Sequence, residues 1–441
     1  MVVGRIAVNA VARAPGRLPL LGHLVHLKRD PLGFLTSLPD YGDLVEIQLG
    51  GEPAIVVCDA ELTRQVFVND RTYDKGGPMF ENARSFCGNG LVTCRRDVHR
   101  TQRRLTQAAF HRGRMAGYAH RMASQIVAQT DAWSDGQVID VLAELMSLST
   151  KTLVETVFCD TLDRNKFPAM HANINTLVYG VLREMITPPH LKGLPGFSSR
   201  RFRAACADVR TTILTAVANA RATGQKSGAV LTALVNACDE HGRRRLSDQD
   251  LNDIMTTIFL AGTETTATTL TWCLYLAAAH PEVAQRLRRE ADAVLSGKAA
   301  TYEDIPHLTY ATQVIMETQR LYPTAWILTR RTTRPAVLAG QRIPAGRTII
   351  CSPYLIHHRR DLYPEPDVFD PGRPAPARGT YVPFGGGARR CIGDEFGTIE
   401  MTLALSTIAA AWSLEIVRPP TVKVGVLIRP YGLRMRVRRR C

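Results

Sequence analysis

The chain carries, close to its C-terminal end, the stretch Pro383-Phe-Gly-Gly-Gly-Ala-Arg-Arg-Cys-Ile-Gly393. Its glycines bring one cysteine, Cys391, to the expected start of a helix, where the positive end of the helix dipole and the backbone N–H groups favour a thiolate. A thiolate in this place is a metal ligand. Three glycines let the backbone approach something large and flat: Gly385, Gly387 and Gly393. Arg389 supplies a fixed cation that can pair with a carboxylate on that flat group.

Two other interpretations of this loop compete with a metal site, namely a dinucleotide-binding loop and an ordinary buried cysteine at a helix start. The pattern Gly385-x-Gly387 lacks the third glycine of the dinucleotide fingerprint, and no hydrophobic strand leads directly into it. The flanks argue against an ordinary cysteine, because a phenylalanine, the glycines, an arginine and a final glycine all accompany Cys391. We therefore favour the metal-binding interpretation.

A second segment, Leu260-Ala-Gly-Thr-Glu-Thr-Thr-Ala267, lies in a long apolar helix. The Thr265 hydroxyl can bond back to the carbonyl of Ala261 and loosen the helix, and Gly262 leaves a groove in which a diatomic ligand fits. Glu264 and Thr265 would then form a proton-delivery pair, which heterolytic cleavage of an O–O bond requires. Alone, such a threonine-rich stretch is more often a patch on a helix surface.

Pairs of charged residues one helical turn apart occur at two further places. Glu317 and Arg320 share one helical face and can form a charge-assisted bond. Glu61 and Arg64 have the same spacing, and we predict a surface ion pair there. Spacing alone therefore does not distinguish a structural network from a solvated pair.

Taken in their order along the chain, these motifs resemble those of the cytochrome P-450 superfamily. The cysteine loop resembles its heme-binding signature through Phe384, Gly385, Arg389, Cys391 and Gly393, and the threonine helix resembles its oxygen-activating helix through Ala261, Gly262, Glu264 and Thr265. The resemblance covers residues 15–393. It implies heme b with an axial thiolate from Cys391, and a reaction that inserts one atom of O2 into an unactivated C–H bond with two electrons and two protons. Cysteinate pushes electron density toward the iron and favours O–O cleavage.

The same resemblance assigns roles to several charged residues. Arg373, at the end of Phe369-Asp-Pro-Gly-Arg373, would join Glu317 and Arg320 in a buried network that supports the cysteine loop. Cations that would contact the heme propionates are His99 and Arg103, which lie one helical turn apart, and Arg330. The chain departs from the family at Ala108, where a proline is usual, and Arg331 leaves the register of Arg330 open.

The chain's sequence patterns indicate a mainly α protein with small β-sheets, and the resemblance implies the cytochrome P-450 fold, a single domain shaped like a triangular prism. Residues 44–49 and 54–57 predict a hairpin, and 336–338 and 348–351 predict short strands. We expect an irregular segment at 1–23 and a small sheet within 24–99. A helical body should follow over 100–322, with loops near 188–190 and 193–199. Residues 323–441 should contain small sheets, the heme loop and a last helix that begins near Cys391.

Composition excludes several classes of protein. The 441 residues contain no apolar run long enough for a membrane span, and residues 1–14 lack the pattern of an export signal. The ten cysteines show no C-x-x-C pair, which favours a reducing cytoplasm, and the resemblance implies that this cytoplasm is bacterial. The net charge of +15 comes without a nucleic-acid-binding motif, so the basic stretch 434–440 is interpreted as a solvated tail. We expect a monomer.

The resemblance also implies the partners, because no segment is left for a fused reductase domain. Electrons derived from NAD(P)H would come through an external ferredoxin and its ferredoxin reductase. Arginines expected near the cysteine side of the heme offer a basic docking face that remains open to interpretation as solvated charge: Arg103, Arg104, Arg112, Arg114 and Arg390.

The substrate is expected to be a small hydrophobic molecule, because the candidate pocket segments are apolar. These segments are Met79-Phe80, Phe86, Leu91, residues 178–185, Ile258, residues 324–327 and Val426-Leu427. Residues 320–331 and 351–354 look similar to bacterial sesquiterpene hydroxylases of natural-product pathways, which places a terpene first. A fatty acid or a macrolide is the alternative substrate.

Three other classes of protein fit the motifs less well. A heme enzyme that rearranges peroxides or dehydrates oximes would need no proton-delivery pair, so Glu264 and Thr265 argue against it. A heme sensor would share the cysteine but form no oxygen-dependent product. A terpene cyclase needs aspartate clusters for magnesium, and the acidic patches at 239–240 and 248–250 are short and lie beside arginines.

Overall fold

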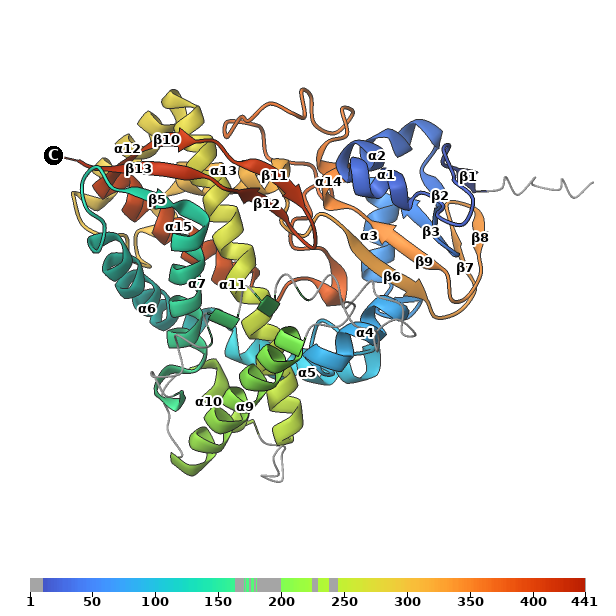
Figure 1. The fold of residues 1–441 in the computed structure, drawn as a ribbon, viewed down its shortest axis with the longest axis horizontal. Helices are drawn as coiled ribbons and strands as arrows, with labels where there is room; N and C mark the ends of the chain where they lie inside the picture. Colours follow the sequence, from blue (N-terminus) through green and yellow to red (C-terminus); the bar gives the residue numbers. More distant parts are fainter. Residues whose placement is uncertain are drawn as a thin grey trace, which may run out of the picture. The chain divides into compact units, whose positions relative to one another are not determined.

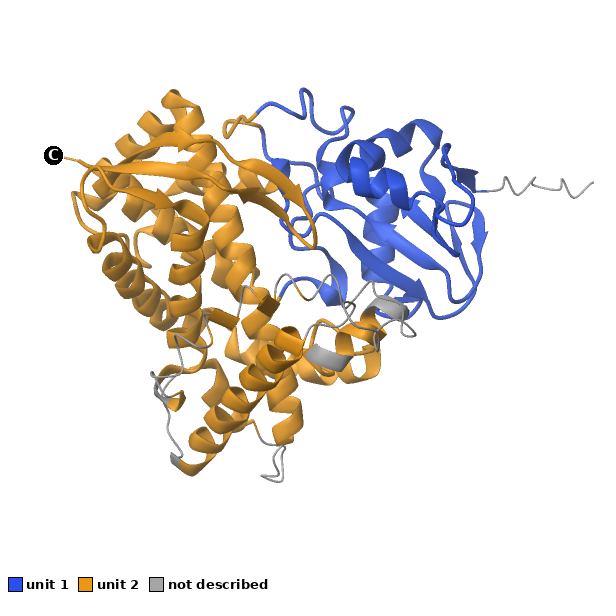
Figure 2. Ribbon diagram, in the orientation of Figure 1, with its two compact units in different colours: residues 1–77, 320–368, 374–391 blue, residues 78–319, 369–373, 392–441 orange. Residues whose placement is uncertain are grey.

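The structure is a computed structural model of the whole chain, and it describes residues 11–162, 170, 172–173, 176–177, 180, 200–223, 229–237 and 245–440. Of residues 78–79, 85–86, 160 and 223 it describes the backbone alone. The chain forms two compact units (Figure 2). Unit 1 comprises residues 1–77, 320–368 and 374–391, and unit 2 comprises residues 78–319, 369–373 and 392–441. Helices dominate and the sheets are small, which confirms the predicted fold class.

Unit 1 is built on a six-stranded sheet with the order β1-β2-β3-β9-β6-β4. Its strands are β1 (Ala12–Arg13), β2 (Leu44–Leu49), β3 (Glu52–Val57), β4 (Tyr73–Asp74), β6 (Leu328–Thr332) and β9 (Thr348–Cys351). Strands β7 (Ala336–Leu338) and β8 (Gln341–Ile343) form a separate ladder, and the helices are α1 (Leu24–Arg29), α2 (Pro31–Ser37), α3 (Ala60–Val68) and α14 (Pro353–His357). The sheet joins an N-terminal hairpin to strands from far along the chain.

The hairpin of β2 and β3 was correctly predicted, with Leu49 opposite Glu52 across a turn at Gly50 and Gly51. Gly50 has a φ of 59°, a left-handed conformation that glycine adopts readily. Helix α3 lies against this sheet, and its apolar side chains complete the core of the unit (Figure 1). This packing places Phe67, near the end of α3, beside the cysteine loop.

Unit 2 holds most of the helices in the described part of the chain. They are α4 (Pro78–Cys87), α5 (Arg96–Ala109), α6 (Arg112–Asp131), α7 (Val141–Val157), α9 (Arg200–Thr223), α10 (Val230–Val235), α11 (Asp248–Ala279), α12 (Pro281–Leu295), α13 (Thr309–Leu321), whose last two residues belong to unit 1, and α15 (Asp394–Ala411). Helix α11 runs through the unit with α7, α9 and α15 packed against it (Figure 1). The predicted loops near 188–190 and 193–199 lie outside the described residues.

The capping box at the start of α11 explains one of the acidic patches. The Ser247 hydroxyl accepts from the Asp250 N–H, and the Asp250 carboxylate accepts from the Ser247 N–H. Asp248 forms an ion pair with Arg221 at 2.6 Å. These acids therefore serve the helix end, and among the described residues no group of three or more His, Cys, Asp or Glu could hold a metal ion.

The basic C-terminal stretch was wrongly interpreted as a solvated tail. Residues Arg434–Arg439 form β13, the central strand of a sheet with β10 (Trp412–Arg418) and β5 (Val138–Asp140). Met435 and Val437 are buried on one face, and alternate arginines on the other face pair with acids such as Glu415. The alternation of apolar and charged residues was the strand signal that the charge count obscured.

A second ladder, of β11 (Thr421–Val424) and β12 (Ile428–Tyr431), precedes β13. No helix in the described ranges is both long and apolar enough to cross a bilayer. The organisation of the chain as one domain stays a prediction.

Candidate active site

The cysteine loop, residues 382–391 of unit 1, is closed by hydrogen bonds of its own backbone. The Cys391 N–H donates to the carbonyl of Phe384 at 3.0 Å, and the Gly385 N–H donates to that of Val382 at 3.0 Å. Gly385 has a φ of 67°, which the tight turn requires. Cys391 is exposed and precedes the first residue of α15, Asp394, by three positions. The predicted delivery of one cysteine to a helix start is thus present.

The glycines of the loop serve two different purposes. A Cβ on Gly387, whose φ is 63°, would lie 1.9 Å from the carbonyl oxygen of Phe67, so this glycine is required by the close approach of α3. The packing of α3 thus gives Gly387 a role within unit 1, and its approach to a flat group stays a prediction. A Cβ on Gly393 would meet no described atom within 4 Å. Of these two glycines, Gly393 is the one that leaves space for a flat group.

His357 connects the loop to the rest of unit 1. This side chain is fully buried, and its Nε2 accepts a hydrogen bond from the Val382 N–H at 2.9 Å. Its ring is stacked on Tyr381 with centroids 5.5 Å apart. The start of the loop is therefore fixed by one buried imidazole, a residue that the sequence analysis missed because nothing nearby in the sequence marks it.

Arg320 is a buried charged group in the interior of unit 1. It is 2% exposed, and its guanidinium donates to the carbonyls of His357 at 3.0 Å, Pro366 at 2.6 Å and Val368 at 3.1 Å. Buried charges are tolerated where hydrogen bonds satisfy their donors. Arg320 thus holds the segment that carries His357, and through it the cysteine loop.

The other members of the predicted network lie together in unit 2. The Arg373 Nε donates to Glu317 Oε1 at 3.0 Å, and the same carboxylate oxygen accepts from the Asp370 N–H at 3.1 Å. Glu317 and Arg373 have side chains only 6% and 16% exposed. By contrast, Glu61 and Arg64 form the predicted surface pair at 2.6 Å, with both side chains about half exposed, at 56% and 47%.

Two buried cations lie near the cysteine loop within unit 1. Arg389 pairs with Asp74 of β4 at 2.6 Å, and its predicted pairing with a carboxylate of a bound group stays a prediction. Arg330 is 3% exposed, and burial lowers its pKa to about 10. It donates to the carbonyl of Thr329 at 2.9 Å, and no described carboxylate lies within 4 Å of it. A buried guanidinium in this state favours an anionic ligand.

The threonine segment lies in the middle of α11. The Thr265 hydroxyl donates to the Ala261 carbonyl at 2.8 Å, which confirms the predicted back-bond. The segment is helical throughout, within an α11 that runs from Asp248 to Ala279. A Cβ on Gly262 would lie 2.9 Å from Leu153 Cδ1 of α7. On the side of α11 that faces α7, Gly262 therefore allows the two helices to pack closely, and the predicted groove for a diatomic ligand stays a prediction.

Ala261 marks an opening in the surroundings of α11. Most residues of this helix are buried, yet Ala261 is exposed, and Gly262 and Thr265 are partly exposed. Exposure in the middle of a helix that is otherwise covered by apolar side chains indicates room for a bound group. Ala261 and Thr265 lie one turn apart, so they share this face.

Glu264 is buried, with 7% of its surface exposed, and it forms an ion pair with Arg429 of β12. Burial raises the pKa of Glu264 to about 7, although Arg429 favours the ionised form. A carboxyl group with a pKa near neutrality can both give and accept a proton at physiological pH. Arg429 was not foreseen, because 165 positions separate it from Glu264 in the sequence.

His99 and Arg103 lie one turn apart on α5, as predicted. His99 is buried, with 2% exposure, whereas Arg103 is partly exposed and donates from Nε to Gln107 Oε1 at 3.5 Å. The same helix contributes Gln102, whose Nε2 donates to the Asn89 carbonyl at 2.9 Å. Helix α5 thus directs the imidazole of His99 inward and is tied through Gln102 to the loop before it.

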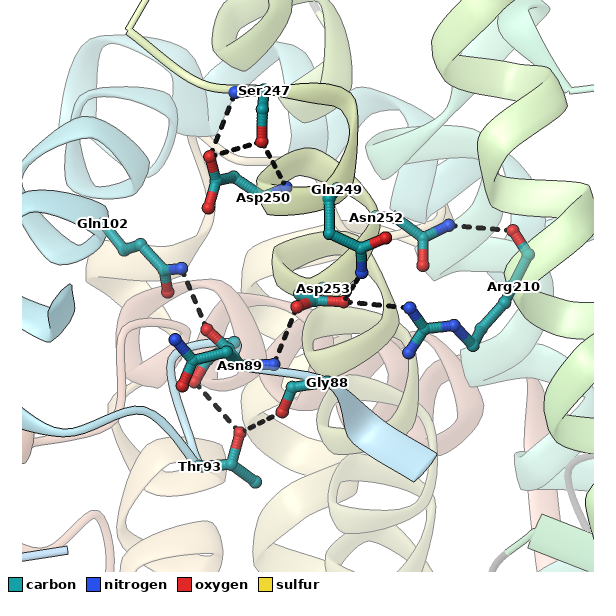
Figure 3. Close-up of polar contacts among 11 residues, drawn as sticks. Gly88, Asn89, Thr93, Gln102, Arg210, Ser247, Gln249, Asp250, Asn252 and Asp253 are labelled. Atoms are coloured by element: carbon teal, nitrogen blue, oxygen red, sulfur yellow. Dashed lines mark hydrogen bonds and ion pairs between the residues drawn. The ribbon is translucent and has the colours of Figure 1, made fainter. Parts of the chain in front are cut away.

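Asp253 of α11 organises that loop (Figure 3). Its carboxylate accepts from the Asn89 N–H at 2.7 Å, from Gln249 at 2.7 Å and from Arg210 of α9 at 3.3 Å. A Cβ on Gly88 would lie 2.1 Å from Asp253 Oδ1, so the loop passes directly over the carboxylate. One buried acid therefore joins α11, α9 and the loop between α4 and α5.

The chain matches a family model and several curated proteins over nearly its whole length. The model described as Cytochrome P450 matches residues 13–435. "Cyclooctatin synthase" of Streptomyces melanosporofaciens is 41% identical over 425 residues, covering 95% of this chain and 91% of the relative. "Pentalenene oxygenase" of Streptomyces avermitilis is 39% identical over 435 residues, covering 96% of each.

A third relative, "Cyclooctat-9-en-7-ol 5-monooxygenase" of Streptomyces melanosporofaciens, is 37% identical over 416 residues, covering 93% of this chain and 90% of the relative. Identity at this level over most of both chains extends well beyond the short motifs. The chain therefore belongs to the cytochrome P450 family, and it is a heme b monooxygenase that uses a cysteine thiolate, O2 and electrons derived from NAD(P)H.

Proposed function

We propose that this enzyme hydroxylates a terpene, inserting one atom of O2 into a C–H bond of a small hydrocarbon or terpene alcohol in bacterial natural-product biosynthesis. The observation that carries the proposal is the 39% identity, over 96% of both chains, to a relative named for the oxygenation of pentalenene, a terpene hydrocarbon. The relative named for cyclooctat-9-en-7-ol, a terpene alcohol, supports the same substrate class.

We assign the iron ligand to Cys391, and we propose heme-binding residues in each of the two units. The exposed thiol of Cys391, the buried cation of Arg330 and the open space at Gly393 suit a flat, dianionic group. When bound, heme b activates O2, and the thiolate favours O–O cleavage. The propionates would be held by His99, Arg103, Arg330 and Arg389, with Asp74 orienting Arg389, while Phe384, Gly385, Gly393, Ala261 and Gly262 would border the ring.

Glu264 and Thr265 are assigned to proton delivery. Thr265 lies on the same exposed face of α11 as Ala261. Its hydroxyl can donate one proton to a group bound at this face while it accepts another. Glu264 stands next to it in the chain, with a pKa of about 7. In this scheme the carboxyl gives its proton through the hydroxyl to the oxygen-binding site and regains one from solvent.

The substrate is expected to be apolar and uncharged. In the described parts of the expected pocket segments, Ile327 is partly exposed and Val426 is exposed, and five large apolar side chains are buried: Phe80, Leu91, Ile258, Trp326 and Leu427. Residues 178–179 and 181–185 and the side chains of residues 79 and 86 lie outside the described part of the chain. The guanidinium of Arg429, two residues after Leu427, is engaged by Glu264. This arrangement favours a terpene over a fatty acid.

We assign the electron donor to a ferredoxin that is reduced by a ferredoxin reductase. Arg104, Arg112 and Arg114 are exposed in unit 2, and Arg112 forms an ion pair with Glu395 at 3.4 Å, with both side chains exposed to solvent. An acidic ferredoxin would complement these charges. The eight cysteines in the described part of the chain are free thiols, which suits the bacterial cytoplasm, and we expect a monomer.

Substrate binding tests the proposal directly. The purified ferric holoprotein is titrated with pentalenene and, as the control, with dodecanoic acid, and the Soret band is followed. We expect the terpene to produce a low-to-high-spin shift, because it displaces water from the iron, and the fatty acid to produce none. Turnover with ferredoxin, its reductase and ¹⁸O2 should then place one labelled oxygen atom in the product. A shift with dodecanoic acid and none with the terpene would reverse the assignment.

A further inference from the structure

Arg429 reaches the interior of unit 2 from the hairpin of β11 and β12. Its side chain is 14% exposed, and that of its partner Glu264 is 9% exposed. Two opposite charges with so little contact with water interact far more strongly than a surface pair. The pair therefore has the strength to control how readily Glu264 binds a proton.

The position of Arg429 is fixed by the packing of its strand on α11. The indole Nε1 of Trp272, two turns after Glu264, donates to the carbonyl of Ile428 at 3.2 Å. The residues on either side of Arg429, Ile428 and Pro430, are both buried. Since β12 is held in this way, the guanidinium is presented to Glu264 by the fold and not by a flexible surface chain.

We propose that Arg429 is a positioning residue that keeps Glu264 acidic enough to deliver protons during the monooxygenase reaction. The inference rests on the proposed role of Glu264 and Thr265. In each proton transfer the O–H bond of the Glu264 carboxyl breaks, its proton moves to the Thr265 hydroxyl as that hydroxyl releases its own proton forward, and the carboxylate is left facing Arg429. A proton from solvent then restores the carboxyl, so that charge and protons balance.

Without Arg429, burial alone would act on Glu264 and make it a weaker acid. Burial and Arg429 are the two causes that set its pKa. A second buried carboxyl of unit 2, Glu400 on α15, has a pKa raised to about 8 by burial, so it titrates in a similar range. The titration of Glu264 must therefore be measured as the difference between a protein with Glu264 and the Glu264→Gln variant, so that the signal of Glu400 cancels.

The hairpin supplies a matched control for the loss of a cation. Lys423 lies directly opposite Arg429 in the register of β11 and β12. Its ammonium group lies 3.6 Å from the centroid of the Tyr431 ring and takes no part in the ion pair with Glu264. Lys423→Met thus removes a positive charge from the same hairpin without touching the proposed relay.

The test compares wild type, Arg429→Met, Arg429→Lys and Lys423→Met. The carboxyl C=O stretch of Glu264 is titrated by infrared difference spectroscopy against Glu264→Gln, and product formed per NAD(P)H consumed is measured from pH 6 to 9. In Arg429→Met the titration midpoint should rise by about one to three pH units, and coupling should fall on the order of tenfold. Lys423→Met should match wild type, and Arg429→Lys should recover most of both properties.

The outcomes separate this inference from the proposed function. An unchanged midpoint in Arg429→Met, with coupling lost only in Glu264→Gln, overturns the role of Arg429 and leaves the proton relay standing. A raised midpoint with full coupling in both Arg429→Met and Glu264→Gln overturns the relay itself. If Arg429→Met does not bind heme, Arg429→Lys decides, because a lysine that restores heme binding but not the midpoint also contradicts the inference.

Discussion

Replacing Arg320 with methionine should strongly destabilise the protein. The guanidinium is 2% exposed and satisfies the carbonyls of His357, Pro366 and Val368, which would all be left buried without this donor. Because an unsatisfied buried acceptor costs about 1–3 kcal/mol, we expect the free energy of unfolding to fall by at least about 3 kcal/mol. Denaturant unfolding followed by circular dichroism, with heme content of the purified protein, measures the effect.

The control for this prediction is Arg64→Met. Arg64 has the same spacing from its glutamate as Arg320, but its pair with Glu61 is exposed, so its loss should leave the unfolding midpoint unchanged. Equal effects of the two substitutions would show that burial and the three carbonyls do not explain the importance of Arg320. A stable Arg320→Met protein with full heme content would show the same.

Replacing Thr265 with alanine should uncouple the enzyme. The variant keeps the helix but lacks the hydroxyl on the face that Ala261 marks, so NAD(P)H consumption continues while product formation falls by about tenfold to a hundredfold. The electrons from NAD(P)H that do not lead to product should instead reduce O2 to hydrogen peroxide or water. The measurement is the ratio of product to NAD(P)H, together with the peroxide formed.

Thr263→Ala is the matched control, because the Thr263 hydroxyl makes the same type of back-bond, to the Phe259 carbonyl, but is buried within the helix packing. It should retain coupling close to that of wild type. If both variants uncouple the enzyme equally, the effect comes from the helix backbone. If Thr265→Ala stays fully coupled, Thr265 does not deliver protons.

Local sequence patterns predicted the parts of this protein that depend on neighbouring residues. The hairpin of β2 and β3, the helix after Cys391 and the back-bond of Thr265 each follow from a few consecutive positions. The tight turn of the cysteine loop also follows from consecutive positions, because the left-handed backbone at Gly385 requires a glycine.

Contacts between distant segments could not be predicted in this way. The carbonyl of Phe67 explains Gly387, the side chain of Leu153 explains Gly262, and neither partner is marked in the sequence. The partners of Arg389 and Glu264, which are Asp74 and Arg429, come from short strands whose register only the folded chain sets. The sequence could therefore name the charged residues of the site but not the pairs that tune them.

The carbon monoxide difference spectrum of the dithionite-reduced protein, compared between wild type and Cys391→Ser, tests the central assignment most directly. We expect a strongly red-shifted Soret band in wild type, because the thiolate donates electron density to the iron, and its loss in the variant. Cys351→Ser, at a buried thiol of the same unit, should keep the band. A wild-type protein without heme, or a band that survives in Cys391→Ser, would contradict the assignment of Cys391 as the iron ligand.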